Sequence, residues 1–302
     1  MKRLTFVLVS VLLALILSGC PGTGQDPDTY TVSYDGNGYT GGVVPTDSSA
    51  YETGMEVSVL DNSGGLVKGV ATFSGWYSEA GGTGTDRAVD STFPMGSANV
   101  ILYAKWTYLI GDTGPAGGLV FYDKGSYSDW WQYLEFAPAD VDSGNIKEWG
   151  GQGYKITGTG TAIGTGSDNT AVIVDFHDGL IPDYYTNIFA TNQDFTNPTC
   201  TFVDSNDGTV AAKLCANYNN VANGVTYSDW FLPSGDELNE IWVNIVDDGF
   251  GANNNIGSFD EAYYWSSSES NENYAWTHHF TDGTPYNAVK NGSYRVRAIR
   301  AF

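Results

Sequence analysis

Residues 229–238, which read DWFLPSGDEL, predict a buried segment followed directly by the start of a helix. Ser234 and Glu237 have the S-x-x-E spacing of a capping box, in which each residue bonds the backbone N–H of the other. The apolar residues Leu238, Ile241, Trp242 and Ile245 then recur at helical spacing, and Gly249 is a plausible end. We therefore expect a core helix here, with Asp236 and Glu237 favoured by its dipole.

Three further stretches accompany this helix in a fixed order. They are GPAGGLVFY at 114–122, YWSSS at 264–268 and YRVRAIRAF at 294–302. Together the four motifs resemble the C-terminal domain of the Legionella collagen-like adhesin, from about Leu109 to Phe302. The resemblance implies a C-type-lectin-like fold and a bacterial surface protein, and it says little about the ligand.

The bulk composition sets limits on the class of protein. A length of 302 residues is sufficient for two domains, and 14% aromatic residues with 38 glycines favour short strands with many turns. The formal charge is −22, which repels nucleic acid and anionic surfaces at long range. A nucleic-acid partner is therefore not expected.

The first 20 residues predict a lipoprotein signal peptide. Lys2 and Arg3 precede an apolar run that is too short for an ordinary membrane span, and the run ends in Leu-Ser-Gly-Cys at Cys20. This ending resembles a lipobox, which implies lipidation of Cys20 and anchoring in a lipid membrane; an ordinary secretory signal is the alternative. Residues 21–29 form a short tether. Because no Asp follows Cys20, resemblance to enterobacterial sorting favours the outer membrane.

Residues 30–107 predict a first domain of short strands. Alternating runs occur at 31–34, 55–60, 71–77 and 99–106, with a turn signal at 35–38. The FSGWY and LYAKW endings resemble a single copy of the Listeria–Bacteroides repeat, also called the internalin B-repeat, which implies a small β-grasp-like fold. Trp76, Tyr103 and Trp106 are expected in its core rather than on a ligand platform.

Residues 108–302 predict the second domain. We expect strands at 117–122, 130–136, 262–267, 274–280 and 293–302, and a helix at 209–218 capped by Asp207 or Thr209. The Gly/Thr-rich stretch 158–170 lacks the Gly-Lys ending of a phosphate loop, so it predicts a tight loop bonded by Asn169 and Thr170. The fold class is α+β, with a β-grasp-like repeat followed by a C-type-lectin-like domain of two helices on an antiparallel sheet.

Two cysteines remain beyond Cys20. In an oxidising compartment Cys200 and Cys215 are expected to form a disulfide, with two buried thiols as the alternative. Formylglycine-generating enzymes have a related fold and use cysteines late in the domain, whereas no Cys follows Cys215 here. An enzyme is therefore not expected.

The sequence predicts no metal site and no cofactor. His278 and His279 are adjacent on a strand and point to opposite faces. Residues 204–208, and the oxygens of Asp247, Asp248, Asn253 and Asn254, leave calcium possible, but no motif supports it.

Arg295, Arg297 and Arg300 form the densest basic group of the chain. We expect them to lock the last strand onto the helix by pairing with Glu237 and Asp236, with a site for acidic ligands as the alternative. Ser234, Glu237 and Arg297 are thus predicted to be structural residues.

The ligand face is expected between residues 269 and 287. Aromatic rings with nearby amides and carboxylates suit sugars. The candidate residues are Glu269, Asn271, Asn273, Trp276, His278, Asp282, Tyr286 and Asn287, and Trp276 could equally be core.

The sequence thus predicts a lipid-anchored, extracytoplasmic protein of the cell envelope that binds a glycan or a host or matrix protein without catalysis. The alternatives are a structural envelope or matrix component and, least favoured, an enzyme on the formylglycine-generating fold.

Overall fold

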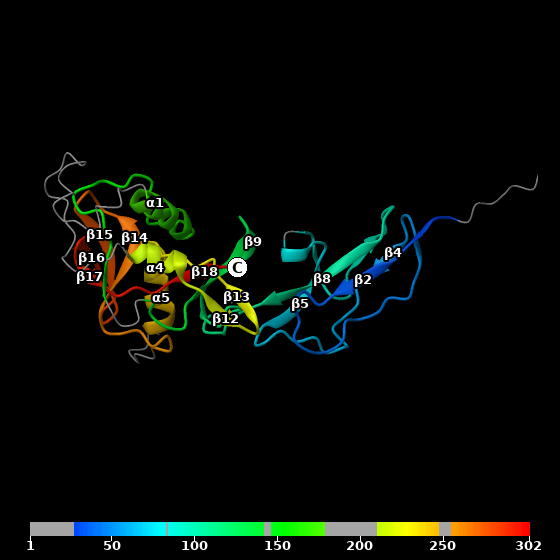
Figure 1. Cartoon of the computed structure of the whole chain (residues 1–302). Coiled ribbons are helices and arrows are strands. Elements are labelled where there is room, and N and C mark those ends of the chain that lie inside the picture. The colour runs from blue at the N-terminus through cyan, green and yellow to red at the C-terminus, as the bar shows by residue number, and fades with distance from the viewer. Residues whose placement is uncertain (1–26, 83, 142–145, 179–209, 248–254) are drawn as a thin grey trace, which may run out of the picture.

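The computed structural model describes residues 27–82, 84–141, 146–178, 210–247 and 255–302. Two parts lie end to end, one from blue to cyan and one from green to red in Figure 1. The C-terminus returns to the middle of the molecule, beside β9 (Leu119–Ser128). Strands in several sheets and short helices together make an α+β protein, as the sequence predicted.

The N-terminal part is built of short strands around one apolar core. Its elements are β1 (Thr29–Tyr30), β2 (Val32–Asp35), β3 (Tyr51–Glu52), β4 (Glu56–Ser58), β5 (Thr72–Tyr77), η1 (Ala80–Gly82), β6 (Asp86–Arg87), β7 (Thr92–Pro94) and β8 (Val100–Thr107). The main sheet has the order β2-β8-β5-β6, with β2 parallel to β8. Trp76 and Trp106 are buried, so both belong to the core as expected.

The C-terminal part contains the remaining elements. They are β9, β10 (Trp131–Phe136), β11 (Lys147–Glu148), α1 (Gly166–Asp178), α4 (Ala211–Asn217), β12 (Asn220–Ala222), β13 (Val225–Tyr227), α5 (Gly235–Ile241), η2 (Trp242–Val246), β14 (Tyr263–Glu269), β15 (Tyr274–His279), β16 (Pro285–Val289), β17 (Ser293–Tyr294) and β18 (Ile299–Ala301). The two larger sheets have the orders β18-β10-β9 and β14-β15-β16.

Several expected elements differ from the structure. The run 293–302 is two short strands, and the third strand of the β14–β15 sheet is 285–289 instead. Trp130 lies in the turn before β10 rather than in the strand. Helix α4 begins after Val210, which makes no side-chain cap, and the expected cap residues Asp207 and Thr209 lie outside the described residues.

The Gly/Thr-rich stretch forms a tight loop that leads into helix α1. As predicted, Asn169 and Thr170 hold it: the Gly160 N–H donates to Asn169 Oδ1 at 2.8 Å, and the Leu232 N–H donates to Thr170 Oγ1 at 2.9 Å. The helix itself, from Gly166 to Asp178, was not expected.

Aromatic side chains join the two parts of the molecule. Tyr108, Tyr133 and Phe302 have ring centroids 5.2 to 5.5 Å apart. Tyr133 exchanges backbone hydrogen bonds with Phe302, and its side chain packs in the same apolar cluster as Trp76 and Trp106. The last residue of the chain therefore contributes to the contact between the two parts.

Within the described ranges, no helix has the length and apolar character needed to cross a membrane.

Candidate functional site

The first turn of α5 is fixed by a capping box. The Glu237 N–H donates to Ser234 Oγ at 3.3 Å, and the Ser234 N–H donates to Glu237 Oε2 at 2.6 Å. The Gly164 N–H donates to Glu237 Oε1 at 2.8 Å, and a Cβ on Gly166 would lie 2.2 Å from Oε2. The glycines of the loop thus let its backbone approach a buried carboxylate.

Burial raises the pKa of Glu237, while the backbone N–H groups of Ser234, Gly164 and Gly166 act in the opposite direction. The pairing of this helix start with the terminal arginines is not present. Arg297 instead pairs with Asp140, and Arg295 pairs with Asp260. Arg300 pairs with Glu135 and Asp229. These carboxylates were not recognised because they are far from the arginines in sequence.

A pocket of about 240 Å³ lies between the start of α5 and strand β15. We call it the Trp276 pocket; it is lined by Thr161, Gly235, Asp236, Leu238, Asn239, Ser266, Trp276, Thr277, His278 and Pro285. Trp276 and His278 share one face of β15, because residues two apart in a strand point the same way. Asn287 and Pro285 are their cross-strand neighbours on β16.

His278 is the unusual member of this pocket. Its side chain is buried, yet its Nε2 has no hydrogen-bond partner within the part of the chain that the structure describes. Burial lowers its pKa to about 4, with the carboxylate of Asp282 acting against this shift. The imidazole is therefore neutral at pH 7, and Nε2 can donate or accept one hydrogen bond, depending on its tautomer.

The structure brings some of the predicted ligand residues together and separates others. Trp276 and His278 line the pocket, and Asn287 lies beside Trp276. Tyr286 is paired with Thr277, so it lies on the face of the hairpin opposite to Trp276. There its ring centroid lies 5.5 Å from that of Tyr263.

Asn271 and Asp282 bond within their own turns, and Asn273 bonds to the distant residue Gln152. The Tyr274 N–H donates to Asn271 Oδ1 at 3.1 Å, and Asn273 Oδ1 accepts from Gln152 at 3.0 Å. Asp282 contacts His279 Nδ1 at 3.0 Å. None of the three lines the Trp276 pocket.

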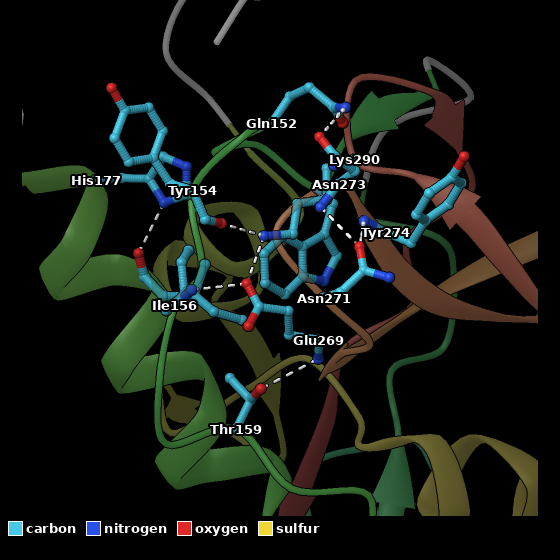
Figure 2. A network of polar contacts seen from close by, with 12 residues as sticks. Gln152, Tyr154, Ile156, Thr159, His177, Glu269, Asn271, Asn273, Tyr274 and Lys290 are labelled. Atoms are coloured by element: carbon cyan, nitrogen blue, oxygen red, sulfur yellow. Dashed lines mark hydrogen bonds and ion pairs between the residues drawn. The ribbon is translucent and has the colours of Figure 1, made fainter. Parts of the chain in front are cut away.

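Glu269 belongs to a buried polar network, shown in Figure 2. Its carboxylate pairs with the Lys290 ammonium, and both side chains are almost fully buried, at 3% and 0% exposure. The Ile156 N–H donates to Glu269 Oε1 at 2.7 Å, and Lys290 also donates to the Tyr154 carbonyl at 2.7 Å. Because these groups satisfy each other, Glu269 is placed as a structural residue instead of a ligand contact.

Eight of the ten pocket residues were not predicted as ligand contacts, and three of the eight have polar side chains that matter for the proposal below. Asp236 and Asn239 are three apart on α5, and Thr161 comes from the Gly/Thr-rich loop. The helical spacing of Asp236 and Asn239 was a usable signal, but nothing in the sequence places Thr161 opposite β15.

No group of three or more His, Cys, Asp or Glu side chains is placed to hold a metal ion within the described ranges. The candidate calcium residues 204–208, Asp248, Asn253 and Asn254 lie outside those ranges, as do Cys20 and Cys200. Cys215 is buried in α4. Because Cys20 and Cys200 are not described, the lipidation and the disulfide stay predictions.

Comparison with known proteins finds two family matches. Residues 172–300 match the Lcl C-terminal domain, and residues 30–105 match the Listeria-Bacteroides repeat domain. The two matched segments follow each other in the predicted order. This confirms both resemblances and their order, and it supports an adhesion-like surface protein with an unspecified ligand.

Two relatives from Evansella cellulosilytica match about a quarter of the chain. A "Putative Gly-rich membrane protein" is 44% identical over 78 residues, which are 26% of this chain and 9% of the relative. A "Putative membrane protein" is 36% identical over 80 residues, which are 26% of this chain and 12% of the relative. The chain thus spans only about a tenth of the length of these relatives.

A solved fimbrial protein from Bacteroides ovatus aligns with 90% of this chain and 69% of its own chain, at 12% identity. The TM-score is 0.37, which is too low to establish a shared fold.

Proposed function

We propose that this chain is a non-catalytic binding protein of the bacterial cell envelope, and that it holds a glycan in the Trp276 pocket. The observation that carries the proposal is that His278 lines the pocket while its buried Nε2 has no hydrogen-bond partner among the described residues. A buried polar atom without a partner is costly, and a ligand hydroxyl would supply the missing hydrogen bond.

The other lining groups are suited to the same ligand. The half-buried ring of Trp276 offers an aromatic wall for the apolar face of a sugar, and Asp236 and Asn239 offer carboxylate and amide partners for its hydroxyls. At about 240 Å³ the pocket is smaller than the ~300–1,000 Å³ of sites for drug-sized ligands. We infer that one sugar residue enters it while the rest of the glycan stays outside.

The finer features of fold and location belong to the same proposal. We place the C-terminal part in the C-type-lectin-like class and the N-terminal part in the β-grasp-like class, as the domain matches favour. We propose that acylated Cys20 anchors the protein at the outer membrane. Labelled fatty acid should enter the wild type and not the Cys20→Ser variant, and equal labelling of both would refute the anchor.

A glycan array tests the proposed function. The secreted chain from residue 21 onward should bind a defined subset of glycans, and Trp276→Ala should lose that binding. Tyr286→Ala is the matched control, because this exposed aromatic residue lies on the same hairpin but on the opposite face. If no glycan is retained, the structural-envelope alternative is favoured; if only Tyr286→Ala loses binding, the site lies on the other face.

A further inference from the structure

Trp130 is exposed in a way that its surroundings do not explain. All nine tryptophans lie in described residues, and Trp130 is 83% exposed whereas the others are buried or half-buried. It occupies the turn between β9 and β10 with Asp129, and their φ angles are 70° and 51°. Turns of this kind favour Asn and Gly, and a bulky residue at positive φ is rare. The local backbone therefore does not require a tryptophan at this position.

A cavity of about 410 Å³ opens beside this turn. We call it the Trp130 cavity; it is lined by Asp129, Trp130, Trp131, Leu134, Gly164, Ser167, Asp168, Asp229, Phe231, Glu237 and Ala301. Four of these residues are acidic, three are aromatic and none is basic. The wall includes Glu237, whose carboxylate is fully buried, so the acidic character is built into the core as well as the rim.

The charges of this cavity are only partly neutralised. Asp229 is paired with Arg300, and Asp129 lies 3.7 Å from Lys124 Nζ. Among the described residues, Asp168 at the exposed start of α1 has no ion-pair partner. Aromatic faces beside uncompensated carboxylates attract cations, and the chain's charge of −22 adds long-range attraction of the same sign.

One cation of the chain itself is already bound by an aromatic face and a carboxylate. The Lys124 ammonium lies 3.8 Å from the ring centroid of Trp131, with the Asp129 carboxylate as its counter-charge. It also donates to the Ser128 carbonyl at 2.6 Å. The same turn thus combines an indole face and a carboxylate around an ammonium group, and it presents a second indole, Trp130, to solvent.

We propose that the Trp130 cavity binds an organic cation, namely an alkylammonium group, with Trp130 as its aromatic platform and Asp168 as its counter-charge. The group could belong to a free quaternary ammonium compound or to a lysine side chain of a partner protein, because both present the same chemistry. This site is separate from the Trp276 pocket and does not depend on glycan binding.

Titration of the full-length protein, followed through the indole N–H signals of Trp130 and Trp131, which both line the cavity, tests this proposal. Tetramethylammonium chloride represents the free cation, and a short lysine peptide represents the partner side chain. Sodium chloride at matched ionic strength and tert-butanol, a neutral molecule of similar shape, serve as controls. We expect saturable shifts with at least one cationic probe and none with either control.

Variants then locate the site. Followed through the Trp131 indole N–H, which both variants keep, Trp130→Ala should weaken binding about tenfold and Trp130→Phe distinctly less, because a smaller aromatic face remains. Asp168→Asn should weaken binding without a change in fold, and Trp276→Ala should leave it unchanged. Equal binding of tert-butanol, unchanged affinity in Trp130→Ala, or no saturable shift with either cation would overturn the proposal. A response to the peptide alone would identify a protein partner as the source of the cation.

Discussion

Asp236 and Glu237 are neighbours in sequence with opposite environments. Glu237 is fully buried and bonded to backbone N–H groups, whereas Asp236 is exposed on the wall of the Trp276 pocket. Glu237→Ala would leave the N–H groups of Ser234 and Gly164 buried without partners, each at about 1–3 kcal/mol. We expect the free energy of unfolding to fall by about 3 kcal/mol, measured by chemical denaturation.

Asp236→Asn should unfold like the wild type and bind glycan more weakly. A large loss of stability in Asp236→Asn alone would reverse the two roles.

His278 gives the protein a defined sensitivity to acid. Burial lowers its pKa from 6.5 to about 4, so the unfolded state binds a proton more readily than the folded state. Its contribution to the free energy of unfolding is therefore complete above about pH 6.5 and is lost as the pH falls through about 4. The loss amounts to about 3 kcal/mol. Buried His177, with a pKa also lowered to about 4, has the same sign.

Unfolding free energies measured between pH 7 and pH 4 test this assignment. His278→Gln should lose less stability over this range than the wild type. Parallel curves for the wild type and His278→Gln would contradict the assignment.

At the residue level, local sequence predicts only the interactions that are themselves local. The capping box was visible because Ser234 and Glu237 are three residues apart. The partners of the arginines were not, since Asp140 lies 157 residues from Arg297. The orphan Nε2 of His278 likewise depends on which elements pack over it, and no spacing in the sequence encodes that.

At the scale of elements, the Lys290–Glu269 pair ties the end of β14 to the end of β16 and to the loop that carries Tyr154 and Ile156. Removing one partner of a buried pair leaves an uncompensated charge, at a cost of about 3–5 kcal/mol. We expect Lys290→Met to lose that much in chemical denaturation, and the double variant Lys290→Met/Glu269→Leu to regain a large part of it.

Lys213→Met is the matched control, since it breaks the more exposed pair with Asp178 and should cost less than about 1 kcal/mol. Equal losses for Lys290→Met and Lys213→Met would mean that the Lys290 pair adds nothing beyond a surface contact.

The predictability of an element depended on the strength of its periodicity. Strand β2 alternates between buried and exposed residues and β8 between buried and half-buried ones, and both were expected within a residue or two. Helix α1 was missed because its first turn lies in a Gly/Thr-rich stretch that reads as a loop. Strand β16 was missed because it begins with Pro285 and buries only Ala288.

At the scale of the whole molecule, the aromatic contact between the two parts should make them unfold together. Phe302→Ala removes a ring that stacks on Tyr133 and meets Tyr108 edge-on, at a cost of about 2 kcal/mol for this partly exposed site. We expect one calorimetric transition in the wild type and two in Phe302→Ala. Leu109→Ala, an exposed junction residue, should keep one transition. Two transitions already in the wild type would show that the parts are thermally independent.

The domain order could be read from sequence because each domain carries local motifs. The contact between the domains could not, because it packs Tyr133 and Phe302 into the same cluster as Trp76 and Trp106 from a distant part of the chain. The Trp276 pocket arises in the same way from a loop, a helix and a hairpin.

The most direct test of the glycan-binding claim is calorimetric titration of an array-selected glycan into the wild type, Trp276→Ala and Trp130→Ala. We predict that Trp276→Ala weakens the affinity at least about tenfold, as expected when an aromatic wall is lost from a small enclosed site. Trp130→Ala should bind the glycan as the wild type does, because Trp130 lines the separate acidic cavity. Unchanged affinity in Trp276→Ala would contradict the account, whether or not Trp130→Ala binds more weakly.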